Sequence, residues 1–146
     1  MDNKNNSTTD LFQILSGSDS IDTFLDEYDS ELEKPTFSAY INKLIKDRDC
    51  SIPRIIDRSG MSQSYCYQLF KGIRKPSRDK IIQLGVGMEL SLKEINKLLK
   101  VGGKSELYCR DKRDAIIIFG INSGSTIMEL EELLFERELQ AFMDFL

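Results

Sequence analysis

The sequence predicts an all-α protein. Apolar residues recur at three- and four-residue spacing in one segment after another, and most of these segments begin at a residue that commonly caps a helix. The chain of 146 residues is long enough to bury a core without disulfides or metals. We therefore expect a five-helix domain over residues 36–102 with additional helices at both ends.

Residues 1–35 form an acidic N-terminal segment. Its first seven residues, MDNKNNS, are polar and predict disorder. Two short amphipathic helices are expected after them, the first following the cap-like run Thr8-Thr9-Asp10 and the second following Ser20. The apolar positions are Leu11, Phe12, Ile14 and Leu15 in the first helix, and Ile21, Phe24, Leu25 and Tyr28 in the second. Pro35 ends this pattern.

The first three helices of the 36–102 domain are predicted from their caps. Thr36 precedes an apolar stripe that continues to about Arg48. Ser51 is expected to cap a second helix, in which Pro53 is tolerated because the first turn needs no amide donor. After the turn Ser59-Gly60-Met61, Ser62 is expected to cap a third helix that runs to Gly72.

Two more helices complete the domain. Pro76-Ser77 opens the fourth, which is expected to end near residues 85–88. Ser91 and Glu94 have the spacing of a capping box, in which each side chain accepts a hydrogen bond from the other residue's amide. The fifth helix begins there, and Gly102-Gly103 ends it.

Residues 103–146 predict a helical C-terminal extension. The first helix covers Asp111 to Asn122, although its β-branched run Ile116–Ile118 leaves a short strand as an alternative. The run Ile116–Phe119 is expected in the core, with a dimer contact as the other possibility. Thr126 and Glu129 form a second capping box, from which the last helix starts.

The charge is unevenly distributed along the chain. The formal net charge is −4, but residues 37–100 carry thirteen basic and six acidic side chains. Residues 1–36 carry two basic and nine acidic side chains, and residues 101–146 carry five and nine. A basic segment between two acidic ones indicates either an anion-binding surface or ordinary variation among solvated faces.

The third predicted helix, residues 62–71, has two different faces. Cys66, Leu69 and Phe70 follow helical spacing and are expected to pack inward. The opposite face is neutral and polar, and glutamine on such a face can pair with the N6 and N7 edge of adenine. The candidate base-contacting residues of DNA are Gln63, Ser64, Tyr67 and Gln68.

A basic segment follows this helix directly. Between Gly60 and Asp79 the sequence has no carboxylate that would repel a phosphate backbone. Cations beside a base-reading helix fix its register on DNA without reading sequence. The candidate phosphate-contacting residues are Ser62, Lys71, Arg74, Lys75 and Arg78.

Residues 60–64, GMSQS, and 69–72, LFKG, resemble the helix-turn-helix of Cro and lambda-repressor-type (XRE family) transcriptional regulators. The resemblance covers roughly residues 37–101, and residues 37–146 are similar to Gram-positive bacterial regulators of this type. It implies a lambda-repressor-like fold, and a repressor that inserts the 62–71 helix into the major groove. It also implies a homodimer on double-stranded DNA, with Gln63, Ser64 and Gln68 near base edges.

Other functions are less compatible with the sequence. It has no histidine, no glycine-rich phosphate loop and no nucleophile motif, so we expect neither an enzyme nor a cofactor. Three cysteines at unpatterned spacing indicate no metal site and fit the cytoplasm, and no apolar run is long enough for a membrane span or signal peptide.

The alternative function is a helical protein-interaction module, such as an antitoxin or adaptor, that binds a protein partner through its C-terminal helices. DNA binding would then be secondary or vestigial. The acidic N-terminal segment also allows two interpretations: it either covers the basic face or forms a packed helical layer with an acidic outer side.

Overall fold

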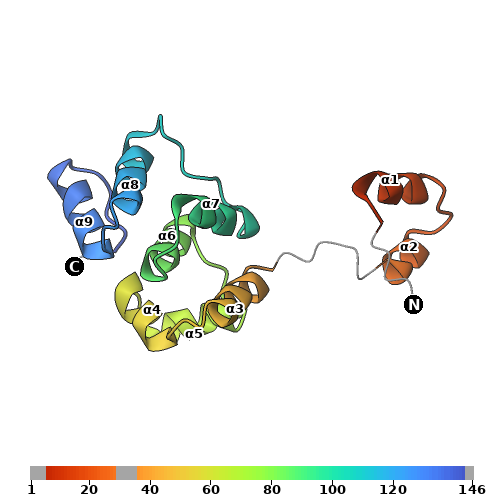
Figure 1. Cartoon of the computed structure of the whole chain (residues 1–146), viewed down its shortest axis with the longest axis horizontal. Helices are drawn as coiled ribbons and strands as arrows, with labels where there is room; N and C mark the ends of the chain where they lie inside the picture. Colours follow the sequence, from red (N-terminus) through yellow and green to blue (C-terminus); the bar gives the residue numbers. More distant parts are fainter. Residues whose placement is uncertain (1–5, 29–35, 144–146) are drawn as a thin grey trace. The chain divides into compact units, whose positions relative to one another are not determined.

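The computed structural model describes residues 6–28 and 36–143, and all regular structure within these ranges is helical. Nine helices are present there (Figure 1). Their bounds are α1 Thr8–Ser16, α2 Ile21–Glu27, α3 Phe37–Asp47, α4 Ile52–Ser59, α5 Gln63–Phe70, α6 Arg78–Gly87, α7 Leu92–Val101, α8 Lys112–Asn122 and α9 Ile127–Glu136. The chain divides into two compact units, one containing α1 and α2 and the other containing α3–α9.

The first unit is a pair of short helices. Ser7, not the predicted run 8–10, is the N-cap of α1, and it forms a capping box with Asp10. Most of the predicted disordered start, residues 1–5, lies outside the described residues. Phe24 of α2 is the only buried residue of the two helices, and its ring lies 5.1 Å from that of Tyr28. Four large apolar side chains of the pair stay exposed: Phe12, Leu15, Ile21 and Leu25.

The predicted caps of the second unit are confirmed. The side chains of Thr36, Ser51, Ser62, Ser77 and Ser91 each accept a hydrogen bond from the amide three residues later. Each bond satisfies one of the amides that a helix leaves free in its first turn. The third helix of this unit, α5, ends at Phe70 rather than at the predicted Gly72, which instead adopts a left-handed conformation with φ of 75°. The helix starts follow the sequence closely.

Helix α6 is the centre of this unit. It packs against α4 on one side and α7 on the other (Figure 1). Its residues Ile81, Ile82 and Leu84 are fully buried. A Cβ atom on Gly87 would lie 2.9 Å from the backbone nitrogen of Ser59 in α4. Because glycine has no Cβ, the backbones of α4 and α6 can lie in direct contact at this position. Gln83 of α6 donates a hydrogen bond to the carbonyl of Ser59 and joins the same two helices.

The C-terminal helices α8 and α9 complete the core. Residues 112–122 are helical, which excludes the short strand as the conformation of the run 116–118. Ile117 of α8 and Leu130 and Leu134 of α9 are fully buried and belong to the same hydrophobic cluster as α6. Helix α9 contacts both α6 and α8, while α8 also contacts α7. The C-terminal extension is thus part of one compact unit with α3–α7.

Candidate nucleic-acid interface

Helices α4 and α5 follow each other across a short turn. Gly60 ends α4 in the left-handed conformation, with φ of 73°, and Ser62 caps α5 two residues later. Cys66, Leu69 and Phe70 on the inner side of α5 are buried, as predicted from their spacing. The side-chain Nδ2 of Asn42 in α3 donates to the carbonyl of Phe70, so α3 holds the C-terminal end of α5.

The outward side of α5 presents polar side chains to solvent. Gln63, Ser64 and Tyr67 are exposed and Gln68 is half-buried, so the four predicted base-contacting residues share one accessible side of this helix. The ring of Tyr67 packs edge-on against Phe70, with centroids 6.2 Å apart. This contact attaches the exposed side chain of Tyr67 to the buried ring of Phe70.

The residues after α5 fold back onto it. The backbone amides of Ile73 and Arg74 donate to the carbonyl of Gln68, over 3.0 and 3.3 Å. The side chain of Arg74 also binds Gln68, because its Nε donates to Oε1 of Gln68 over 2.9 Å. The Arg74 guanidinium also lies over the ring of Tyr65, 5.2 Å from the centroid. Arg74 is therefore held beside α5 by three contacts with two residues, Gln68 and Tyr65.

Burial raises the pKa of the Tyr65 hydroxyl, and the nearby Arg74 cation only partly opposes this shift. Tyr65 is accordingly a neutral aromatic platform at physiological pH. Lys80 of α6 approaches the same ring, 5.6 Å from its centroid. Cations over an aromatic ring are attracted by its negative face. In the structure Tyr65 packs under the cationic groups of Arg74 and Lys80.

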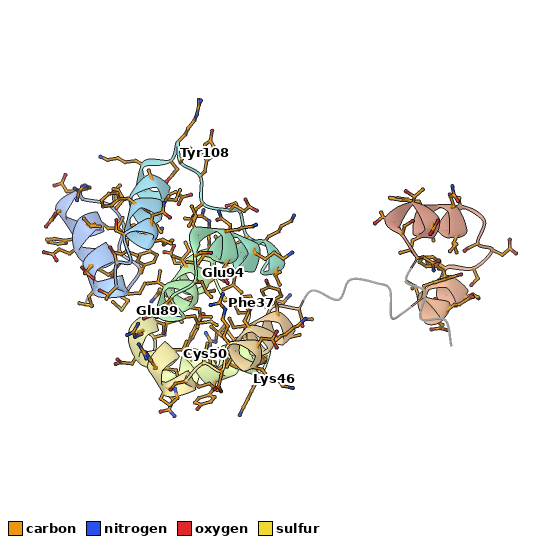
Figure 2. All side chains as sticks on the ribbon, viewed as in Figure 1. Phe37, Lys46, Cys50, Glu89, Glu94 and Tyr108 are labelled. Carbon is orange, nitrogen blue, oxygen red and sulfur yellow. The ribbon has the colours of Figure 1, made fainter. Side chains whose placement is uncertain are left out.

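The basic side chains around α4 and α5 differ in whether an acidic residue pairs with them. Arg48 pairs with Glu94, and Arg54 and Arg58 of α4 pair with Glu89 at the end of α6, which Figure 2 labels. Lys71 and Lys75 are exposed and have no carboxylate partner among the described residues. Their charge is available to an external anion. The positive potential beside α5 therefore comes from the loop after it, and not from α4.

Arg78, which was predicted to contact phosphate, is used inside the protein instead. Its Nη1 and Nη2 donate to the two carboxylate oxygens of Asp114 in α8, over 2.9 and 2.8 Å. Its Nε and Nη2 also donate to the carbonyls of Ser105 and Glu106. A guanidinium with four such bonds has little capacity left for a phosphate. We therefore leave Arg78 out of the interface.

The neighbouring residue on each helix forms a second such contact, with the acidic and basic partners exchanged between the helices. Arg113 of α8 donates through Nη1 and Nη2 to Asp79 of α6, over 2.9 and 3.0 Å. Adjacent residues 78 and 79 thus grip adjacent residues 114 and 113 in a reciprocal pair of bidentate ion pairs. We call these four residues the α6–α8 clamp. It fixes α8 to the first turn of α6, directly after the basic loop.

The α6–α8 clamp is largely shielded from water. Asp114 is only 6% exposed. Burial on its own would raise the pKa of this carboxyl, but hydrogen bonds from Arg78 and the Tyr108 amide outweigh it and hold the pKa below its usual range. The hydrogen bond to Asp114 in turn raises the pKa of Arg78. Both groups are therefore charged at neutral pH.

The chain after α9 is tied to the same region. The Arg113 guanidinium lies 5.0 Å from the centre of the Phe142 ring and donates to the carbonyl of Gln140. The buried carboxylate of Glu131 in α9 accepts hydrogen bonds from the amides of Phe142 and Met143, over 2.6 and 3.1 Å. Met143 lies against the turn between α4 and α5, where its sulfur is 3.0 Å from the place that a Cβ atom on Gly60 would occupy.

The remaining candidate chemistry is limited. Cys50 is half-buried, Cys66 buried and Cys109 exposed, and all three are free thiols. Burial raises the pKa of the Cys66 thiol, which keeps it protonated and unreactive. Within residues 6–28 and 36–143, no group of three or more His, Cys, Asp or Glu side chains could hold a metal ion. The described helices include none that could cross a bilayer.

Comparisons with protein-family models, with curated proteins and with solved structures find no match to this chain. The site therefore stands on its own geometry. Asp79, Arg113 and Asp114 were not identified from the sequence as residues that hold the candidate interface in place. The only signal in the sequence is that 78–79 and 113–114 are each a basic residue followed by an acidic one. Only the fold brings these two dipeptides together.

Proposed function

We propose that this protein is a sequence-specific DNA-binding transcriptional regulator of repressor type that inserts α5 into the major groove. The observation that carries the proposal is the accessible side of α5, where Gln63, Ser64, Tyr67 and Gln68 lie without a carboxylate. Exposed Lys71 and Lys75 follow directly. Polar side chains on a helix read base edges, while flanking cations hold the phosphates.

We further propose that α3–α7 form a lambda-repressor-like five-helix domain, in which α4 crosses the backbone and Ser62 donates to a phosphate. Such a protein works in the cytoplasm as a homodimer, without enzymatic activity or a cofactor, on half-sites about one helical turn apart. Selection of binding sites from random duplexes tests this directly. Enrichment of a two-fold-related pair of half-sites supports the proposal, and the absence of any enriched sequence refutes it.

Replacing Gln63 by alanine is expected to relax specificity at a single base position. The side chain supplies a donor and an acceptor to one base edge, so its loss costs about 1–3 kcal/mol against the preferred base and little against the others. Binding to duplexes with all four bases at each position measures this effect. Gln13→Ala, at an exposed glutamine of α1, is the matched control and leaves the specificity profile unchanged. An equal loss on all sequences would contradict base contact by Gln63.

One observation favours a second activity alongside DNA binding. The C-terminal helices expose large apolar side chains, with Phe119 at 64% and Phe135 at 80%. Exposed aromatic residues of this size are common at protein interfaces. We propose that this part of the surface binds a protein partner. Replacing Phe119 and Phe135 by serine should abolish such an association and preserve DNA binding.

A further inference from the structure

We propose that Gln68 and Arg74 act as one unit that reads guanine, so that Arg74 determines specificity in addition to supplying charge. This inference rests on the proposed insertion of α5 into the major groove. It differs from the sequence-based expectation, in which Arg74 contacts phosphate and Gln68 is a glutamine of the adenine-reading kind.

The geometry joins the two side chains before any DNA is present. Arg74 Nε donates to Gln68 Oε1 over 2.9 Å, while the Arg74 amide donates to the Gln68 carbonyl over 3.3 Å. Stacking on Tyr65, with 5.2 Å from the guanidinium carbon to the ring centroid, restricts the remaining freedom of Arg74. Two residues six positions apart are thereby held as a single polar group on the open side of α5.

This arrangement changes which base edge Gln68 can recognise. Recognition of adenine needs the glutamine oxygen to accept from N6 while its NH2 donates to N7. In this protein the oxygen already accepts from a cation, and the positive charge disfavours a second donor beside it. The Gln68–Arg74 pair therefore presents hydrogen-bond donors, namely the NH2 of Gln68 and the Nη groups of Arg74. The Nη groups have no hydrogen-bond partner in the described part of the chain.

A set of donors matches the edge of guanine, whose N7 and O6 are both acceptors. Gln63 provides the internal contrast. Its side chain is exposed and has no cation bonded to its oxygen among the described residues, so it keeps both an acceptor and a donor. Of the two glutamines, Gln63 is therefore suited to adenine and Gln68 to guanine.

The test uses the adjacent exposed residues Arg74 and Lys75, of which only Arg74 is hydrogen-bonded to the side chain of Gln68. Wild type, Gln68→Ala, Arg74→Ala and Lys75→Ala are titrated against duplexes that carry each base at each position of the selected site. In the wild type, one position should prefer guanine by about 5- to 150-fold. Gln68→Ala and Arg74→Ala should both erase that preference at the same position. Lys75→Ala should weaken binding to all duplexes and keep it.

Two results would overturn the inference while leaving the proposed function standing. One is a uniform loss of affinity in Arg74→Ala with the base preference intact, which would return Arg74 to a phosphate contact. The other is a wild-type preference for adenine, rather than guanine, at the position where Gln68→Ala changes the base preference. A wild type without any sequence preference would instead reject the proposed function and the inference together. Because Gln68 and Arg74 lie at the surface, equal melting temperatures can confirm that each variant is folded.

Discussion

Asp114→Ala is expected to destabilise the α3–α9 unit by about 3–5 kcal/mol, because it leaves the Arg78 guanidinium without its partner in a largely buried site. The same carboxylate accepts the amide of Tyr108, so the loop before α8 loses a support as well. Denaturant unfolding followed by circular dichroism measures the loss. Asp47→Ala, at an exposed carboxylate in α3, is the control and should change stability by less than about 0.5 kcal/mol.

A double variant separates the contribution of the ion pair from that of general packing. The double variant Arg78→Met with Asp114→Leu removes both charges and should recover much of the stability, since apolar pairs often replace buried ion pairs without loss. A double variant no more stable than Asp114→Ala would instead point to packing or to the other hydrogen bonds of these residues.

The pH dependence of stability gives an independent check on Asp114. Its folded-state pKa lies below the reference value of 3.8, so its ionised form stabilises the folded protein above that value. The contribution is lost as the pH falls through the depressed pKa of the folded state. We expect the stability difference between wild type and Asp114→Asn to be constant near neutrality and to shrink only in acid below about pH 4. A difference that instead shrinks around neutral pH would contradict this assignment.

The double variant Lys71→Ala, Lys75→Ala is expected to bind DNA about 60-fold more weakly at 0.1 M salt. Each cation that neutralises a phosphate contributes about 0.9 to the slope of log affinity against log salt, so the slope should fall by about 1.8. Titrations between 0.05 and 0.3 M salt, in roughly equal logarithmic steps, measure both quantities.

The natural control is Lys43→Ala with Lys46→Ala, which removes the same charge from two exposed positions of α3. This variant should lose far less affinity and keep the wild-type slope. If both double variants behaved alike, the loop cations would act only through net charge, and not through contact with phosphates.

Helix starts could be predicted from the sequence because they depend on neighbours three residues apart. Ser62, Ser77 and Ser91 cap helices where serine-initiated patterns indicated them. The inner side of α5 was equally accessible, since burial of Cys66, Leu69 and Phe70 follows from their spacing alone. The run of isoleucines in α8 was ambiguous because β-branched residues suit both conformations, and packing of Ile117 against the core decides for the helix.

Long-range polar contacts could not be predicted in this way. Arg78 and Asp114 are 36 positions apart, and only the docking of α8 beside α6 makes them partners. Without that knowledge, an arginine in a basic run is most simply assigned to phosphate. The link between Gln68 and Arg74 spans six positions and depends on the turn of the loop after α5, which helical periodicity does not describe.

The contact between Met143 and Gly60 has a practical consequence for dissecting the protein. A chain shortened to residues 36–102 would retain every residue proposed to touch DNA, but it would uncover the sides of α6 and α7 that α8 and α9 protect. Asp79 and Arg78 would lose their partners, and the turn before α5 would lose its covering methionine. Isolating a minimal binding fragment should therefore start from residue 36 and keep the chain through Met143.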